Sequence, residues 1–236
     1  MNLPDPAIDP RCWRAIDVHS KFHDEHIAFS IACRFVREAV KAARLGHKPL
    51  AEELADFSEK VQPRYRTPED YLIAQLFVGH ISSFELFLQE LTTVVVRKYP
   101  QKIGNYQLKL SDVLAVQDQE ELVFRAAEDV IRKFSYKKPS EYLHDVCEIL
   151  SVDPRTIEDD WKVFIEAKAR RDLGVHAGWI CNDTYVRKLA EVKVSSSLSV
   201  GEPAAPTDYR YLHTVSEALY RIAKALYRET GKKHGV

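Results

Sequence analysis

The feature that most restricts the fold is a long apolar stripe in the middle of the chain. Its members are spaced alternately three and four residues apart: Ala74, Phe77, Ile81, Phe84, Leu88, Leu91 and Val95. This spacing places all of them on one face of an α-helix. Thr67 can cap the start, Pro68 suits the first helical position, and Pro100 marks the end. We therefore predict a helix of about 30 residues, long enough to be the central element of a bundle.

Shorter periodic segments flank this helix. The expected helices cover residues 17–44, 50–61, 120–134, 139–150, 156–169 and 208–230, and Ser111 is expected to cap a further short one. A Val/Ser-rich segment at 192–198 is expected to be extended. Glycine is scarce, with 8 of 236 residues, which disfavours a turn-rich β fold. The sequence predicts one all-α domain over 1–236, an up-and-down bundle with additional short helices and a core motif region at 67–191.

Composition and charge narrow the range of partners. The formal net charge is −1, so an RNA partner has to be argued from a local site rather than from overall charge. No run reaches the roughly 18 uninterrupted apolar residues of a membrane span, and the acidic, proline-rich start does not resemble a secretory signal. Cys12, Cys33, Cys147 and Cys181 are far apart and form no C-x-x-C pair. We expect reduced thiols, a cytoplasmic location and no membrane partner.

Three histidines lie on one face of the expected helix at 17–44. His19, His23 and His26 are four and three residues apart, and helical histidines at such spacing can share a metal ion. The intervening acids do not form the H-E-x-x-H pattern, and no distant further ligand is indicated. A partly solvated polar face is the better interpretation, and we expect no metal and no cofactor.

An arginine and a histidine separated by four residues form the second candidate cluster. The chain holds four Arg/His pairs at spacings of this kind (Arg14/His19, Arg170/His176, Arg171/His176 and Arg228/His234), where about two are expected by chance. The sequence around them favours Arg171 and His176, because an amphipathic helix precedes them and glycines lie nearby. Positions five apart on a helix diverge by about 140°. We therefore expect a break near Gly174 that turns both side chains toward one cleft.

Two segments resemble the HEPN superfamily. The signature of that superfamily, an arginine, a polar residue and a histidine within "RN-x-x-VH-x-x-G", is matched by Arg171, Asp172, Val175 and His176. Residues 83–91, Ser-Phe-Glu-Leu-Phe-Leu-Gln-Glu-Leu, are similar to the central helix of the HEPN branch found among RNA-cleaving and phage-defence proteins. The resemblance implies a small helical bundle that commonly dimerises. It also implies a metal-independent endoribonuclease of toxin–antitoxin or antiphage systems, although some members are catalytically silent.

The chain departs from the signature at two positions. Asp172 replaces the commoner asparagine and adds a negative charge near the expected RNA phosphate. Gly178 falls one residue early for the final glycine, where this chain has Trp179. Gly178 also occupies the position of a tyrosine through which nucleotidyltransferase partners silence some of these toxins, so that mode of control is not expected.

The resemblance and the residue types assign roles. His176 would take the proton of a 2′-hydroxyl, and Arg171 would stabilise the phosphate charge of the transition state. The remaining candidates have competing structural roles: Arg170 in phosphate binding or pairing with Glu166, Asn182 and Tyr185 in orienting substrate or in capping and packing, and Glu85 in holding Arg171 or lying exposed. The expected partners are RNA, a second copy of the chain, and an antitoxin or defence protein. The alternative is a non-catalytic helical interaction or dimerisation module.

Overall fold

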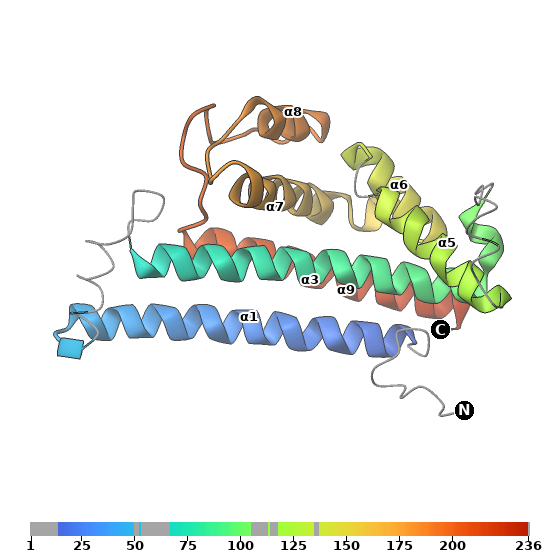
Figure 1. The fold of residues 1–236 in the computed structure, drawn as a ribbon, viewed down its shortest axis with the longest axis horizontal. Helices are drawn as coiled ribbons and strands as arrows, with labels where there is room; N and C mark the ends of the chain where they lie inside the picture. Colours follow the sequence, from blue (N-terminus) through green and yellow to red (C-terminus); the bar gives the residue numbers. More distant parts are fainter. Residues whose placement is uncertain are drawn as a thin grey trace. The chain divides into compact units, whose positions relative to one another are not determined.

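The helical prediction is confirmed. The computed structural model describes residues 14–49, 52, 67–104, 113, 118–134 and 137–235, of which 80% are helical. The described residues contain seven α-helices (Figure 1): α1 (Ala15–Arg44), α3 (Pro68–Lys98), α5 (Gln119–Phe134), α6 (Pro139–Leu150), α7 (Glu158–His176), α8 (Asp183–Glu191) and α9 (Tyr209–His234). Within the described ranges, β pairing is limited to one isolated antiparallel bridge between Ile180 and Pro203.

Helix α3 begins and buries its side chains as the apolar stripe predicts. The Thr67 Oγ1 accepts the backbone N–H of Asp70 at 3.1 Å, which satisfies one of the donors left free at a helix start. All seven members of the stripe are at most 1% exposed. The helix ends at Lys98, two residues before Pro100.

Most of the other expected helices are found, with shifted ends. Helix α6 has the expected bounds, while α7 runs seven residues past the expected end at Ala169 and α9 runs four past Thr230. The extended segment expected at 192–198 is wrong: this stretch is turn and irregular chain after α8. The short helix expected at 50–61 and the cap at Ser111 lie outside the described residues, apart from residue 52.

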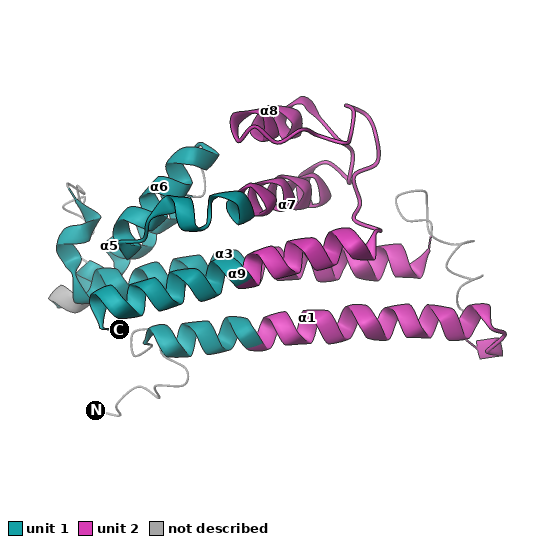
Figure 2. Ribbon diagram, turned by 180° about the vertical axis from the view of Figure 1, so that it is seen from behind, with its two compact units in different colours: residues 1–23, 84–161, 221–236 teal, residues 24–83, 162–220 magenta. Residues whose placement is uncertain are grey.

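The chain divides into two compact units, which Figure 2 shows in different colours. Unit 1 comprises residues 1–23, 84–161 and 221–236, and unit 2 comprises residues 24–83 and 162–220. The boundaries fall inside α1, α3, α7 and α9. The Arg171–His176 motif belongs to unit 2.

Aromatic packing forms the core of unit 1. Phe22 of α1 lies between Phe84 and Phe87 of α3, with ring centroids 5.4 and 5.1 Å away. Trp161 at the start of α7 packs edge-on against Tyr142 of α6, and its indole N–H donates to the carbonyl of Pro139 at 3.3 Å. All five aromatic side chains are at most 5% exposed, so this packing supplies a large share of the buried apolar area of unit 1.

A smaller apolar cluster in unit 2 surrounds the end of α7. Its buried members come from α7, α8 and the segments beside them: Ala169, Leu173, Cys181, Tyr185, Leu189 and Ala204. The segment that carries α8 is closed on itself, because the backbone N–H of Cys181 donates to Glu202 and that of Gly201 donates to Cys181, each at 2.9 Å. A third backbone hydrogen bond, from the N–H of Ala204 to the carbonyl of Trp179 at 2.7 Å, joins the residues that flank Cys181 and Glu202.

One helix within the described ranges, α3, is long and apolar enough to cross a membrane by length and composition alone. The core helix of a soluble protein passes the same test, and the stripe of α3 is buried within the protein. This is weak evidence for a membrane span.

The histidines of α1 pack against aromatic residues of α9. The ring of His19 is stacked on Tyr227 in unit 1 with centroids 4.5 Å apart, and that of His26 is stacked on Tyr220 in unit 2 with centroids 4.7 Å apart. His26 also contacts the hydroxyl of Ser216 at 3.1 Å through Nδ1. Both rings are half-buried, so this side of α1 is more enclosed than a solvated face.

His80 of α3 is the most deeply placed imidazole of unit 2. Its side chain is 4% exposed, and its ring is stacked on Phe29 at 4.2 Å with a 4° interplanar angle. Burial, and next the charge of His26, lower the pKa of His80 to about 3. The folded protein therefore holds this imidazole neutral throughout the physiological range.

We predict that acid destabilises the protein through His80. Between pH 6.5, the usual pKa of an unfolded histidine, and pH 3, the unfolded chain binds a proton that the folded chain does not. The free energy of unfolding should therefore decrease as the pH is lowered. The contribution of His80 to this decrease is about 1.4 kcal/mol from pH 7.5 to pH 5.5. Urea unfolding at both pH values should show this difference reduced in His80→Gln and unchanged in His213→Gln, a variant of an exposed histidine of the same unit. Equal pH dependence in parent and His80→Gln would contradict the prediction.

Candidate functional site

Helix α7 carries the Arg171–His176 motif without a break. The helix continues through Gly174 and ends at His176, so the predicted break near Gly174 is wrong. The chain turns two residues later, where Gly178 and Trp179 both have positive φ angles of 59° and 63°. Because positions five apart on a regular helix diverge by about 140°, Arg171 and His176 leave α7 in different directions.

Gly174 is explained by close packing instead of a break. A Cβ atom at this position would lie 2.6 Å from both Cε2 and Cη2 of the Trp179 indole, a separation that no carbon pair tolerates. Trp179 is 3% exposed and its backbone N–H donates to the carbonyl of Leu173 at 3.0 Å. Because Gly174 has no side chain, the chain can reverse just after His176 and the indole of Trp179 can pack back against α7 at Gly174.

We predict opposite effects from two glycine substitutions in helices. Gly174→Ala should destabilise the protein by roughly 1–3 kcal/mol, because the new methyl group overpacks the indole site. The matched control is Gly79→Ala in α3, where nothing lies within 4 Å of an added Cβ. That change should stabilise by up to about 1 kcal/mol, since alanine favours a helix over glycine. Chemical denaturation of both variants checks this, and a stabilising Gly174→Ala would refute the close-packing explanation.

The two proposed catalytic side chains differ in exposure. His176, the last residue of α7, is exposed, and so are its apolar neighbours Val175 (52%) and Ile180 (44%). The side chain of Arg171 is only 16% exposed, and its Nε lies 3.5 Å from a carboxylate oxygen of Asp172. The imidazole is therefore accessible to a substrate, while the guanidinium is partly enclosed.

The carboxylate of Asp172 is shared between two cations. Besides its contact with Arg171, its Oδ2 accepts a hydrogen bond from Lys188 of α8 at 2.9 Å. The two positive groups offset the charge that aspartate introduces in place of asparagine. Lys188 was not predicted as a site residue, because its 16-residue separation from Asp172 gives no local pattern.

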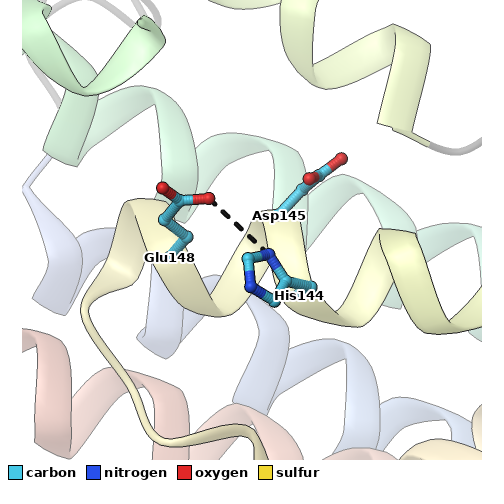
Figure 3. Close-up of side chains that lie close together, drawn as sticks. All are labelled: His144, Asp145 and Glu148. Atoms are coloured by element: carbon cyan, nitrogen blue, oxygen red, sulfur yellow. Dashed lines mark ion pairs between the residues drawn. The ribbon is translucent and has the colours of Figure 1, made fainter.

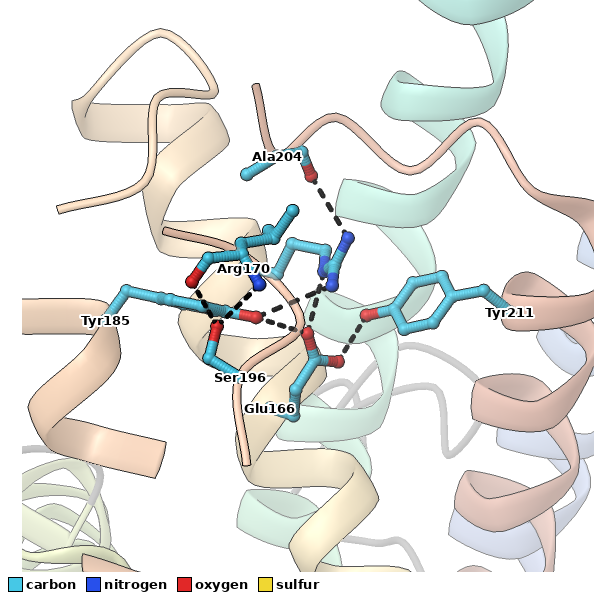
Figure 4. Close-up of polar contacts among 7 residues, drawn as sticks. Glu166, Arg170, Tyr185, Ser196, Ala204 and Tyr211 are labelled. Carbon is cyan, nitrogen blue, oxygen red and sulfur yellow. Dashed lines mark hydrogen bonds and ion pairs between the residues drawn. The ribbon is translucent and has the colours of Figure 1, made fainter. Parts of the chain in front are cut away.

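Arg170 points into a buried polar network (Figure 4). Its Nε donates to Glu166 Oε1 at 2.8 Å, and its two terminal nitrogens lie 3.5 Å from the hydroxyl of Tyr185 and the carbonyl of Ala204. The guanidinium carbon also lies 4.4 Å from the ring centroid of Tyr211. Of the two roles weighed for Arg170, the geometry is that of the pair with Glu166.

Glu166 is the centre of this network. Besides Arg170, it accepts hydrogen bonds of 2.6 Å from the hydroxyls of Tyr185 and Tyr211. Burial, with the negative charge of Glu166, raises the pKa of Tyr211 well above its ordinary value, so the phenol stays a donor. Burial alone would lower the pKa of Arg170, but Tyr211 and Glu166 outweigh it and the pKa is raised.

The other predicted site residues have structural contacts. Asn182 caps α8, because its Oδ1 accepts the backbone N–H of Tyr185 at 3.0 Å. Tyr185 is 2% exposed and packs in the cluster around α7. Glu85 is partly buried in unit 1, where its charge contributes to the raised pKa of Tyr142 after burial, the larger cause. Arg171, which Glu85 was expected either to hold or to leave while lying exposed, belongs to unit 2.

We predict that Glu166→Gln is strongly destabilising. The substitution leaves Arg170 charged and largely buried without its carboxylate, which typically costs about 3–5 kcal/mol. The matched control is Glu121→Gln, which removes another Glu–Arg pair of i, i+4 spacing from the exposed surface of α5 and should cost less than about 1 kcal/mol. Thermal or urea unfolding compares the two variants. Equal losses of stability would show that the hydrogen bonds of Glu166 stabilise the protein no more than an exposed Glu–Arg pair does.

One group in the described residues has the composition of a metal site. The side-chain ligand atoms of His144, Asp145 and Glu148 lie within 4.8 Å of one another (Figure 3). His144 and Glu148 are exposed and 3.6 Å apart, and Asp145 accepts a 2.6 Å hydrogen bond from Lys137. These contacts are those of an ordinary charged surface of α6, where such groups are common without a metal.

Comparison with known proteins gives no relative. The chain matches no protein-family model, and no curated protein or solved structure is significantly similar to it. The function therefore has to be argued from the residues and their geometry.

Proposed function

We propose that the protein is a metal-independent endoribonuclease of the HEPN type, acting in the cytoplasm in a toxin–antitoxin or antiphage system. The observation that carries this proposal is the exposed imidazole of His176 at the end of α7, in the same helix as Arg171 and within the Arg-x4-His pattern. Imidazole is the side chain best suited to take up and release a proton in neutral solution, which fits a base that takes a 2′-hydroxyl proton. The resulting oxygen nucleophile attacks the adjacent phosphorus, the bond from phosphorus to the 5′-oxygen of the next nucleotide breaks, and the products are a 2′,3′-cyclic phosphate and a free 5′-hydroxyl.

Arg171 supplies the positive charge that the transition state needs. A guanidinium stays charged at every relevant pH and can donate two parallel hydrogen bonds to phosphate oxygens. Its ion pair with Asp172 is long at 3.5 Å, and Asp172 has a closer partner in Lys188. Arg171 can therefore exchange this contact for a phosphate without leaving the carboxylate unpaired.

A second copy of the chain would complete the site. Arg171 and His176 diverge on an unbroken helix, so one protomer offers few groups that face the same phosphate. The exposed Val175 and Ile180 on either side of His176 suit a contact with a partner protomer. A two-fold dimer would bring two such pairs to one groove, and the histidine of one protomer would protonate the leaving oxygen.

The same apolar residues favour a second candidate function. Val175 and Ile180 are also suited to a non-catalytic interaction module, in which the partly enclosed Arg171 serves packing and ion pairing only. The two candidate functions predict different RNA cleavage: the nuclease should cleave RNA and lose that activity when the imidazole of His176 is removed, whereas the interaction module should not cleave RNA at all.

We predict RNA cleavage that survives EDTA and leaves 2′,3′-cyclic phosphate ends. His176→Ala should lower the rate by about 10²–10⁴-fold, and Arg171→Ala by a comparable factor, with only partial recovery in Arg171→Lys because lysine lacks the planar fork. The measurement is digestion of labelled RNA with and without chelator, alongside sedimentation to determine the oligomeric state.

Controls on the same unit are His47→Ala and Arg187→Ala, both of exposed residues, which should cleave as the parent does. Unchanged cleavage by His176→Ala, loss of parent activity in EDTA, or full activity of a monomer would each contradict the mechanism. An inactive parent whose Arg171→Ala variant also loses stability would favour the interaction module.

A further inference from the structure

A groove in unit 2 combines an apolar floor with two arginines. It lies between the part of α1 after residue 24 and the start of α9 and encloses a cavity of about 300 Å³, within the range of small-molecule sites. Phe29 and Leu212, at 8% and 2% exposure, form its apolar floor together with Cys33. Burial raises the pKa of the Cys33 thiol to about 11, so the floor carries no charge at neutral pH.

The positive charge of the groove comes from Arg34 and Arg37, one helical turn apart. Both line the cavity and both are exposed. The Nε atom of Arg37 lies 3.4 Å from Oε1 of Glu38, and its guanidinium carbon lies 5.8 Å from the ring centroid of Tyr209. Arg34 has no ion pair or hydrogen bond to any residue that the structure describes. His213 of α9 faces the same cavity and adds a ring that can donate a hydrogen bond.

The two ends of the groove differ in chemistry. Arg37 contacts Tyr209 at the start of α9, whereas His26 contacts Ser216 about two turns later, so the two helices run antiparallel. The cavity therefore has Arg37 and Tyr209 at one end, and Ser30 and Glu217 at the other. One end offers the guanidinium of Arg37, beside which lie Glu38 and, bonded to the Tyr209 hydroxyl, Glu69. The opposite end offers a carboxylate and a hydroxyl that accept hydrogen bonds.

We propose that this groove binds a phosphate ester of a sugar or nucleoside. A terminal phosphate has three oxygens and can accept from both guanidiniums and from His213, whereas a carboxylate has only two oxygens to share. Sugar hydroxyls would donate to Glu217 and Ser30, and the apolar part of the ligand would lie on Phe29 and Leu212. The groove contains neither Arg171 nor His176, so this binding is independent of the proposed cleavage.

The test is isothermal titration of the full chain with AMP, ribose 5-phosphate, adenosine and inorganic phosphate. Both esters should bind saturably at one site per chain, and adenosine and inorganic phosphate at least about tenfold more weakly. Arg34→Gln and Arg37→Gln should each weaken AMP about tenfold or more, because each removes a charge-assisted contact. Arg187→Gln is the matched control: it removes an exposed arginine from α8 of the same unit, outside the groove, and should change AMP affinity less than about twofold.

Two further variants sharpen the result. Glu217→Gln should weaken both esters without weakening inorganic phosphate, and His176→Ala should bind AMP as the parent does, which separates this site from the proposed nuclease. Absence of saturable ester binding by the parent at millimolar concentration would overturn the proposal. Equal binding of adenosine and AMP, or an effect of Arg187→Gln as large as that of Arg34→Gln, would overturn it as well.

Discussion

The arrangement of unit 2 depends on one partly buried carboxylate. Glu166 accepts hydrogen bonds from Arg170 in α7, Tyr185 in α8 and Tyr211 in α9, and so joins three helices at a single point. An ionised carboxylate with little access to water is favourable only when such partners satisfy it. The three donors must therefore be in place together, which makes the positions of α8 and α9 against α7 mutually dependent.

The network explains why two adjacent arginines have different surroundings. Neighbouring residues on a helix point about 100° apart, so Arg170 can fill the buried network while Arg171 lies toward the side of Asp172 and Lys188. Arg170 is held by the network around Glu166, whereas Arg171 contacts Asp172, although the two side chains are similarly enclosed at 12% and 16% exposure. For a site that must meet a phosphate, this division separates the group that maintains the structure from the group that would touch the substrate.

Much of the fold could be predicted from periodic apolar residues, but the local geometry of the motif could not. The stripe on α3 and the cap at Thr67 depend on nearby residues, and both are found as predicted. The i, i+4 spacing of Glu166 and Arg170 left their pairing as one of two roles for Arg170, beside phosphate binding, and the structure shows the pair. The helix break at Gly174 was wrong because a glycine that ends a helix and one that admits a neighbouring ring look alike in sequence. Trp179, the side chain that distinguishes them, reaches Gly174 only because the chain reverses at Gly178. The links to Tyr211 and Lys188 join residues 16 to 45 positions apart, which no local pattern reports, and the roles of Arg171 and His176 in catalysis stay predictions.

The self-closed segment that carries α8 has a consequence for how such a protein can diversify. Its two ends, at Cys181 and Glu202, are joined by backbone hydrogen bonds, so α7 and α9 are connected through a fixed junction whatever lies between. Lengthening a loop whose ends already meet costs only about 0.6 kcal/mol for each doubling of its length. The exposed residues at 195, 197, 199 and 200 are therefore a place where evolution can insert or delete sequence at little cost to the core. A single scaffold could in this way acquire new surfaces on this segment while the carboxylate anchor of Glu166 stays unchanged.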